Sequence, residues 1–201
     1  MLKLYIVPGS CALCPHIVLH EAGLAFTFEK VDPKEKKTES GQDYNAINPK
    51  TNVPSLVLDN GQLLTEVAVI TQYLADQAPA KKLAPAAGTM ERYRLMEWLN
   101  FISSEIHKGF SPLFNPALSA DGKAALMPRL QQRIGYAASA LSNKDYLMGN
   151  FSIADAYLYT VLRWAPRMNV DLTPWPQLKS YMDRIAARPA VQAALKEEGL
   201  A

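Results

Sequence analysis

The sequence predicts two domains, an α/β domain at the N-terminus followed by an all-helical domain. Three observations support this. Within the first 32 residues, a short apolar run is followed by helical periodicity and then by an alternating run. A strong hairpin signal and another amphipathic helix come next. From residue 89 onward, apolar residues recur only with helical spacing.

The first elements predict a β-α-β unit. Residues 2–7 are apolar with β-branched and aromatic members, and Pro8-Gly9 ends this strand. Helical spacing covers residues 15–22 and stops at Gly23. Residues 26–32 alternate as a second strand, so the two strands should run parallel.

The sequence of the rest of this domain predicts a β-hairpin followed by a helix. Residues 55–58 form an apolar strand, and Pro54 before it suits either a first strand position or a cis bond in a tight turn. Asn60-Gly61 predicts a hairpin to a strand that starts at Leu63. Helical periodicity then covers residues 65–76, with the first residue as the cap. The order β-α-β, then β-β-α, is the thioredoxin-like arrangement.

A Pro-, Ala- and Lys-rich stretch without periodicity marks the domain boundary. We assign residues 1–78 to the thioredoxin-like domain, 79–88 to a linker and 89–201 to the helical domain. Ser152 to Asp155 predicts a capping box in the helical domain. Its expected helices cover residues 90–110, 124–141, 153–164, 177–187 and 189–198.

Composition narrows the function classes. A formal net charge of +2 is too small to require a nucleic acid partner, although it permits a small anionic ligand. No run of about 18 apolar residues could span a membrane. The N-terminus has no basic and apolar leader, so a cytoplasmic location is expected. Two closely spaced cysteines also argue against a secreted disulfide scaffold.

Cys11 and Cys14 lie where the first strand passes into the first helix. The N–H groups and dipole of a helix N-terminus favour a thiolate, and Cys-x-x-Cys beside a strand and a helix is typical of redox motifs. Cys11 lies in the turn, where it can reach a ligand, whereas Cys14 better fits a core position. His16 and His20 are four residues apart, but the sequence offers no third ligand, so no metal site is predicted.

Six short sequence motifs, in the same order, resemble those of the bacterial beta class of the glutathione transferase family. The resemblance covers essentially the whole chain. The resemblance implies a glutathione-binding domain followed by a helical domain that supplies an electrophile pocket and dimer contacts. It implies a detoxification enzyme that uses glutathione as co-substrate and needs no other cofactor. The motifs are Pro8-Gly9-Ser10-Cys11, Asn48-Pro49-Lys50 with Val53-Pro54, Leu63-Leu64-Thr65-Glu66, Glu97-Trp98-Leu99-Asn100, Glu105-Ile106-His107-Lys108 and Ile153-Ala154-Asp155-Ala156-Tyr157-Leu158.

The resemblance also implies roles for residues of the first domain. Cys11 matches a catalytic cysteine that faces the glutathione sulfur and can form a mixed disulfide with it, and Ser10 is a weaker hydroxyl donor beside it. Val53 presents its backbone to the cysteinyl part of glutathione just before Pro54, as in strand-like peptide pairing. Asn52, in the same loop, stands where the family often has glutamine.

The two ends of glutathione have their own expected partners. Glu66 and Val67 hold the γ-glutamyl end, because its ammonium needs a carboxylate and its carboxylate suits a helix N-terminus. Lys36 matches a lysine for the glycyl carboxylate. Two positions depart from the family: Val67 replaces a serine or glycine and so offers only its N–H, and Thr51 replaces a glycine.

The helical domain is expected to contribute to two sites. By resemblance, His107 is a catalytic residue that reaches the cleft of Cys11 together with Lys108. Asn100, Ser104 and Glu105 are expected to approach a glutathione bound in the partner subunit, which implies a homodimer.

The leading hypothesis is therefore a transferase that conjugates the glutathione thiol to small hydrophobic electrophiles. One alternative is a glutathione-dependent thiol-disulfide oxidoreductase or reductive dehalogenase, with Cys11 as nucleophile and Cys14 as resolving thiol. A further alternative is a non-catalytic ligand-binding dimer, which Thr51 and Val67 slightly favour.

Overall fold

The computed structural model describes residues 1–201, which form two compact units. The N-terminal unit contains residues 1–84 and 188–201, and the second unit contains residues 85–187. This division differs from the predicted domains at the C-terminal end, because α9 (Pro189–Glu198) packs against α1 (Leu13–Ala22). Arg188, just before α9, forms a bidentate ion pair with Glu21 of α1, with N–O distances of 2.6 and 2.9 Å.

A four-stranded mixed sheet forms the centre of the N-terminal unit, with the strand order β2-β1-β3-β4. β1 (Leu2–Ile6) runs parallel to β2 (Phe26–Lys30), as the β-α-β prediction requires, and antiparallel to β3 (Ser55–Val57). β3 and β4 (Leu63–Thr65) form the predicted antiparallel hairpin. The thioredoxin-like arrangement is thereby confirmed.

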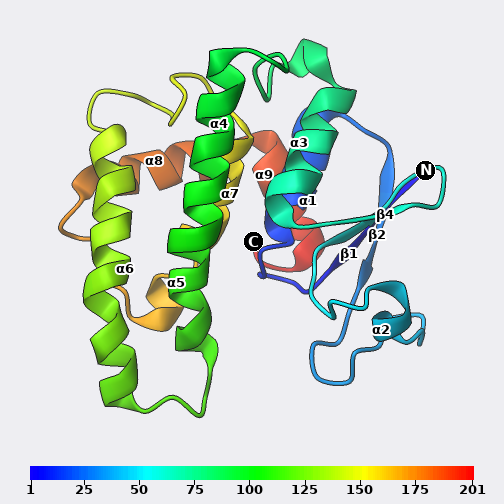
Figure 1. Ribbon diagram of the computed structural model, residues 1–201, viewed down its shortest axis with the longest axis horizontal. Coiled ribbons are helices and arrows are strands. Elements are labelled where there is room, and N and C mark those ends of the chain that lie inside the picture. Colours follow the sequence, from blue (N-terminus) through cyan, green and yellow to red (C-terminus); the bar gives the residue numbers. More distant parts are fainter. The chain divides into compact units, whose positions relative to one another are not determined.

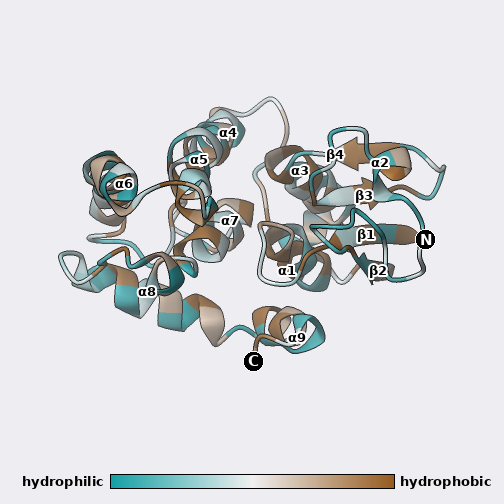
Figure 2. Cartoon of the chain, turned by 90° about the horizontal axis from the view of Figure 1, so that it is seen from below, coloured by the Kyte–Doolittle hydropathy of each residue, from teal (hydrophilic) through white to brown (hydrophobic).

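One face of the sheet is covered by α1 and α3 (Val67–Gln77), which pack side by side (Figures 1 and 2). Leu4, Ile6 and Leu56 are fully buried and share this face, because side chains alternate along a strand and Leu4 pairs with Leu56. Burying an aliphatic side chain of this size contributes roughly 1.5–3 kcal/mol. The unit therefore has a substantial core of its own.

The opposite face of the sheet packs against α2 (Tyr44–Ile47), a short helix that the sequence analysis did not predict. Tyr5, one residue along β1 from the buried Leu4, makes a tilted ring contact with Tyr44 at a centroid distance of 5.6 Å. Val57 of β3 packs against the same cluster. A short 3-10 turn, η1 (Pro79–Lys81), follows α3.

The second unit is all-helical, as predicted. Its centre is α7 (Ile153–Leu162), in which every residue is buried. The predicted capping box begins this helix, and the Ser152 N–H donates to Asp155 Oδ2 at 2.9 Å. The other elements are α4 (Met90–Phe101), η2 (Ile102–His107), α5 (Lys108–Phe110), η3 (Ser111–Phe114), α6 (Ala120–Ala140), η4 (Pro166–Met168) and α8 (Pro176–Ala186).

The predicted helix over residues 90–110 is not a single α-helix. α4 ends at Phe101, and residues 102–107 continue as the π-helix η2 before α5 resumes. Such π-turns within helices are rare and frequently occur at functional sites. η2 contains three predicted site residues, which are Ser104, Glu105 and the predicted catalytic His107.

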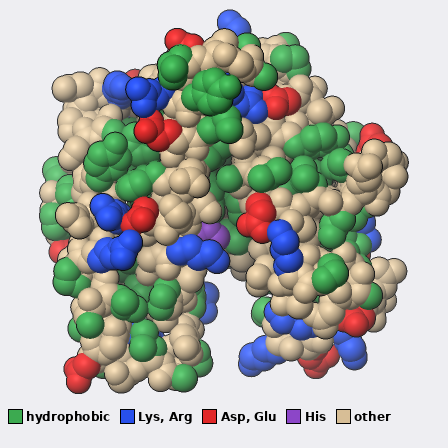
Figure 3. All heavy atoms as spheres, viewed as in Figure 1, with side chains coloured by type: hydrophobic (Ala, Val, Ile, Leu, Met, Phe, Trp, Pro, Cys, Tyr) green, Lys and Arg blue, Asp and Glu red, His purple; other side chains and the backbone are tan.

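Charged side chains of both signs are interspersed over the face shown in Figure 3, as expected from a formal net charge of +2. In both units, ion pairs join neighbouring charges on the surface, such as Lys50 with Glu66 and Arg94 with Glu97. None of the helices is both long and apolar enough to cross a membrane.

Candidate functional site

The loop between β1 and α1 carries the predicted nucleophile. Gly9 has a φ of 73°, which glycine adopts without steric cost, and the Ser10 hydroxyl accepts a hydrogen bond of 3.2 Å from the Ala12 N–H. Cys11 is partly exposed and donates its thiol hydrogen to the Val53 carbonyl oxygen, at an Sγ–O distance of 3.4 Å. α1 begins at Leu13, so Cys11 lies just before the helix, as predicted.

Cys14 lies in the first turn of α1 and is fully buried. Burial raises the pKa of the Cys14 thiol well above its ordinary value, and the neighbouring Cys11 raises it further. Because the thiolate is the reactive form of cysteine, a buried neutral thiol is a poor nucleophile. This environment favours a core position for Cys14 over the role of a resolving thiol.

The loop that precedes β3 brings Val53 next to Cys11. The Val53–Pro54 peptide bond is cis, which is one of the two arrangements compatible with the sequence. The Val53 carbonyl faces the Cys11 thiol, whereas the Val53 N–H has no backbone acceptor within the protein. A backbone donor and a thiol therefore lie side by side.

A buried polar network that the sequence analysis missed fixes this loop. The Tyr44 hydroxyl donates to the Asn52 carbonyl at 3.0 Å and lies 2.7 Å from Ser55 Oγ. Asn48 Nδ2 donates to the same carbonyl at 2.7 Å and to Ser55 Oγ at 3.0 Å. The backbone immediately before Val53 is thus held from two sides. Because α2 is too short to show periodicity, no sequence signal identified Tyr44.

Lys36 approaches the same loop from another segment of the chain. Its Nζ donates to the Thr51 carbonyl at 3.2 Å. Lys36 and Thr51 both have positive φ angles, of 54° and 60°. The structure therefore places the predicted lysine beside the loop that contains Asn52 and Val53.

Glu66 and Val67 lie at the start of α3. Glu66 is the N-cap residue, with a φ of 72°, whereas Thr65, predicted as the cap, is the last residue of β4. The prediction was one residue early because the strand continues through Thr65. The exposed Glu66 carboxylate pairs with Lys50 at 2.8 Å. Val67 is the first helical residue, so its N–H has no acceptor within the helix.

In the second unit, His107 is the last residue of η2 and is held by two aromatic side chains. Its Nδ1 lies 2.7 Å from the Tyr157 hydroxyl of α7, and its ring contacts the Trp164 ring at a centroid distance of 5.1 Å. These contacts fix the orientation of the imidazole. The sequence predicted Tyr157 and Trp164 only as apolar positions of a helix, so the polar contact of Tyr157 was missed.

The residues predicted to face a partner subunit lie along α4 and η2. Asn100 and Ser104 are exposed, and Ser104 Oγ donates to the Asn100 carbonyl at 2.9 Å. Glu105 accepts hydrogen bonds from Arg129 at 3.2 Å and from Arg133 at 2.8 Å. Both contacts lower the pKa of Glu105, and the hydrogen bond from Arg129 has the largest effect. Glu105 is therefore a carboxylate that already has cationic partners in its own chain.

Cavities also lie within the second unit. A cavity of about 280 Å³ contains three predicted site residues, Ser104, Glu105 and Lys108, in its lining. A larger cavity of about 760 Å³ is lined mainly by apolar residues around α7 and α8, including Leu162 and Trp175. None of the predicted site residues lines the larger cavity, so we do not assign it to the predicted reaction.

Comparison with known proteins identifies the family. Residues 9–77 match the model of the glutathione S-transferase N-terminal domain, and residues 101–189 match that of the C-terminal domain. Glutathione S-transferase GstA of Escherichia coli O157:H7 is 45% identical over 200 residues, which cover 99% of this chain and 100% of GstA. The chain belongs to the glutathione S-transferase family.

Solved structures of glutathione S-transferases share the fold. BphK, a bacterial member solved as a ternary complex, matches with a TM-score of 0.97 and 54% identity, covering 98% of this chain and 100% of BphK. A sphingomonad member solved with glutathione matches with a TM-score of 0.95 and 48% identity, covering 99% of this chain and 100% of that one. A beta-class structure also matches, so the resemblance to the bacterial beta class is confirmed.

Family membership confirms the predicted enzyme class and glutathione as its co-substrate. In the N-terminal unit, the structure brings Cys11 and Lys36 next to the loop before β3, which contains Asn52 and Val53. The roles of these residues, and of Glu66, Val67 and the residues of the second unit, stay predictions.

Proposed function

We propose that this glutathione S-transferase holds glutathione along the loop before β3 and transfers its sulfur to small hydrophobic electrophiles. The observation that carries the proposal is the contact of 3.4 Å between Cys11 Sγ and the Val53 carbonyl, beside a Val53 N–H without a backbone acceptor. A short extended peptide can pair with such a backbone segment. A cysteinyl residue paired there has its sulfur next to the Cys11 thiol.

Residues from other segments of the N-terminal unit suit the charged ends of glutathione. The Glu66 carboxylate is exposed and can bind the γ-glutamyl ammonium, while the Val67 N–H at the start of α3 can bind the adjoining carboxylate. Lys36, held at the Thr51 carbonyl, is the cation for the glycyl carboxylate. Asn52 contributes to glutathione binding by holding the loop in place, because its carbonyl accepts hydrogen bonds from Tyr44 and Asn48.

In the proposed reaction, the glutathione thiolate attacks an electrophilic carbon and forms a carbon–sulfur bond. With an aryl halide the halide leaves, and the thiol proton passes to solvent. The dipole of α1 and the polar groups of Ser10 and Cys11 favour the negative sulfur. By the family resemblance we propose His107 as a second catalytic residue and Lys108 as a glutathione-binding residue; Tyr157 and Trp164 hold the His107 ring in one orientation.

Cys11 also supports a thiol exchange reaction. Its thiolate attacks one sulfur of oxidised glutathione, forms a mixed disulfide and releases one glutathione thiolate. Because Cys11 is partly exposed and Cys14 is buried, we propose that this exchange uses one thiol of the protein. A glutathione-dependent oxidoreductase or reductive dehalogenase that uses Cys11 alone is therefore the second candidate function.

Steady-state conjugation of glutathione to an activated aryl halide tests the proposal. We expect turnover by the wild type, a lower rate for Cys11→Ala, and an unchanged rate for the matched control Cys14→Ala. If no electrophile is conjugated at millimolar glutathione although glutathione binds, the transferase proposal is wrong and the non-catalytic reading stands. Equal rates for the wild type and Cys11→Ala would remove Cys11 from conjugation.

We also propose that two copies of the chain form a homodimer, to which Asn100, Ser104 and Glu105 contribute. α4 supports this proposal, because it exposes the large apolar side chains of Met90 and Tyr93 to solvent. A cytoplasmic location is proposed as well, because cysteines in the thiol form suit a reducing compartment. Cell fractionation with an antibody to the chain tests the location.

A further inference from the structure

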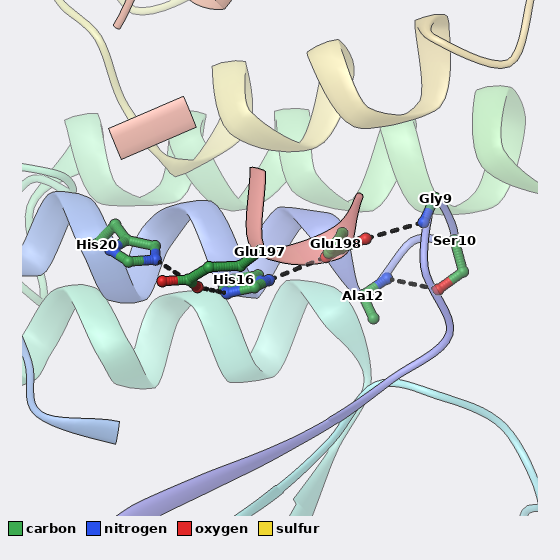
Figure 4. Close-up of polar contacts among 7 residues, drawn as sticks. All are labelled: Gly9, Ser10, Ala12, His16, His20, Glu197 and Glu198. Carbon is green, nitrogen blue, oxygen red and sulfur yellow. Dashed lines mark hydrogen bonds and ion pairs between the residues drawn. The ribbon is translucent and has the colours of Figure 1, made fainter. Parts of the chain in front are cut away.

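A cluster of three side chains joins α1 to α9 within the N-terminal unit. His16 and His20 of α1 both direct Nε2 to the same oxygen of Glu197 on α9, at 2.7 and 3.0 Å (Figure 4). The two nitrogens and a carboxylate oxygen all lie within 4.8 Å of one another. The expectation that the histidine pair lacks a third ligand is therefore corrected, because the fold supplies Glu197 from the far end of the chain.

The histidine rings are held in place before any ligand arrives. His16 is fully buried, and its ring stacks on that of His20 with a centroid distance of 5.4 Å and an interplanar angle of 26°. Phe26 contacts the two rings edge-on, at 5.5 and 5.2 Å. A donor set fixed by packing loses little conformational entropy when it binds an ion.

A fourth residue, Glu198, orients the His16 ring through its other nitrogen, Nδ1. Nδ1 of His16 lies 2.9 Å from Oε1 of the fully buried Glu198 carboxylate, and Nε2 faces Glu197 on the other side. In metal sites, a ligating histidine almost always gives its other ring N–H to a carboxylate, a carbonyl or water, which fixes the tautomer and the ring. Glu198 provides that arrangement here.

The charges also suit a cation. One oxygen of the Glu197 side chain accepts hydrogen bonds from both histidine rings. A carboxylate oxygen only accepts, so its contact with His16 requires hydrogen on Nε2. A metal ion can take the place of that hydrogen and leave the Nδ1 contact with Glu198 intact. Glu197 also lies in the last turn of α9, where a cation is favourable.

We propose that His16 Nε2, His20 Nε2 and the Glu197 carboxylate bind a divalent transition metal ion, with Zn²⁺ as the ion that this donor set fits best. Two histidines and one carboxylate, with a fourth position open to water, match the ligands that zinc takes in open sites. The site is accessible, because the side chains of His20 and Glu197 are 22% and 37% exposed.

Binding requires the Glu197 carboxylate to move away from the two histidine nitrogens. Zinc bonds of about 2.0–2.2 Å in tetrahedral geometry place ligand atoms roughly 3.3 Å apart. The Glu197 oxygen, now 2.7 and 3.0 Å from the two nitrogens, must therefore move outward by about half an ångström. Its side chain faces solvent, and the helix ends one residue later, so the carboxylate has room to move.

The bound ion would also stabilise the loop of the thiol site. Oε2 of Glu198 accepts a hydrogen bond from the Gly9 N–H at 2.8 Å, two residues before Cys11 (Figure 4). The ion, His16, Glu198 and Gly9 thus form a continuous chain of contacts from α9 to the Cys11 loop. Neither family membership nor the proposed binding of glutathione requires this site.

The test uses the untagged chain, reduced and freed of metal with a chelator, without glutathione. Titration with ZnCl₂ in a calorimeter should show one ion per chain, and zinc should raise the thermal midpoint because it binds only the folded state. His20→Ala and Glu197→Ala should each weaken binding at least tenfold and abolish the thermal shift. Circular dichroism shows whether these partly exposed positions leave the variants folded.

Two controls separate this site from other ligands of the chain. His107→Ala removes the third histidine and Cys11→Ser removes the exposed thiol, and both should bind zinc as the wild type does. Cobalt in place of zinc should give the visible absorption of a tetrahedral ion without a thiolate charge-transfer band. Unchanged affinity in both His20→Ala and Glu197→Ala, loss of binding in Cys11→Ser, or no binding at submillimolar zinc would each overturn the proposal.

Discussion

Thr51 has a φ of 60°, in the left-handed region that a β-branched residue disfavours. Removing its Cβ relieves about 1–2 kcal/mol, and the extra freedom of glycine in the unfolded chain offsets about half of this. We therefore expect Thr51→Gly to raise the free energy of unfolding by roughly 0.5–1 kcal/mol. Urea denaturation measures the change. Thr51→Ser keeps the Cβ and should show no such gain, and a loss of stability in Thr51→Gly would contradict this account.

Tyr157 positions His107 through a contact of 2.7 Å. Removing the hydroxyl in Tyr157→Phe keeps the ring packing but deletes one hydrogen bond, worth about 0.5–1.5 kcal/mol. If His107 assists the thiolate, kcat/KM for conjugation should fall by up to about tenfold. Tyr159→Phe on the same helix is the control and should retain full activity. A wild-type value in Tyr157→Phe would show that orienting His107 is not required.

At the scale of single residues, the sequence was most informative where the chemistry is local. The Cys-x-x-Cys string sufficed to place Cys11 in the turn before α1, because strand, glycine and helix signals all lie within a few residues. The contacts of Tyr44 and Tyr157 join segments that are distant in sequence, and no local pattern reports them. Glu197 escaped notice for the same reason.

Glu29 links β2 to β1 and to the following loop. Its carboxylate pairs with Lys3 at 2.6 Å and accepts a hydrogen bond from the Ser40 N–H at 2.9 Å. Burial raises the pKa of Glu29, but these contacts outweigh it and lower the pKa from 4.5 to about 2. A lowered carboxyl pKa stabilises the fold above the unfolded value, and this stability is lost as pH falls toward the folded value.

We therefore expect Glu29→Gln to lower the free energy of unfolding near neutral pH by at most about 3 kcal/mol. Between about pH 4.5 and pH 2 the wild type should lose stability more steeply than Glu29→Gln. Urea denaturation across this pH range measures both slopes. The exposed Glu39→Gln is the matched control and should follow the wild type. Parallel slopes for the wild type and Glu29→Gln would refute the assignment.

Element prediction succeeded where the local signals agreed. The hairpin between β3 and β4 follows from Asn60-Gly61, and the start of α7 follows from its capping box. The π-helix η2 has no such signal, because its side chains keep a nearly helical spacing and only the backbone hydrogen bonds change. α2 has only four residues, about one helical turn, which is too short for an amphipathic pattern to be recognised.

For the whole molecule, we expect a dimer in solution. Met90, Tyr93 and Met96 recur every three residues on α4 and are 65%, 55% and 41% exposed, so they form one apolar side of the helix. Introducing charge with Tyr93→Glu and Met96→Glu together should shift the chain toward monomer in light scattering coupled to size exclusion. Gln192→Glu on α9 adds the same charge elsewhere and should leave the mass unchanged. A monomeric wild type at micromolar concentration would contradict the proposed dimer.

The sequence predicted the order of the elements but not the grouping of the last helix. Periodicity identified α9 as amphipathic, but it cannot say which surface the apolar side covers. The contacts of Glu198 with His16 and Gly9 place α9 in the N-terminal unit, next to the loop that carries Cys11. The C-terminal residues therefore belong structurally to the unit that we propose binds glutathione.

The most direct test of the proposed role of Cys11 is the intact mass of the purified chain after incubation with oxidised glutathione, followed by peptide mapping. We predict one glutathione per chain, attached at Cys11, with Cys14 unmodified because it is buried. A mass lower by two hydrogens would mean that Cys11 and Cys14 pair with each other. That result, an adduct at Cys14 or an unchanged mass would contradict the assignment of Cys11 as the thiol that meets glutathione.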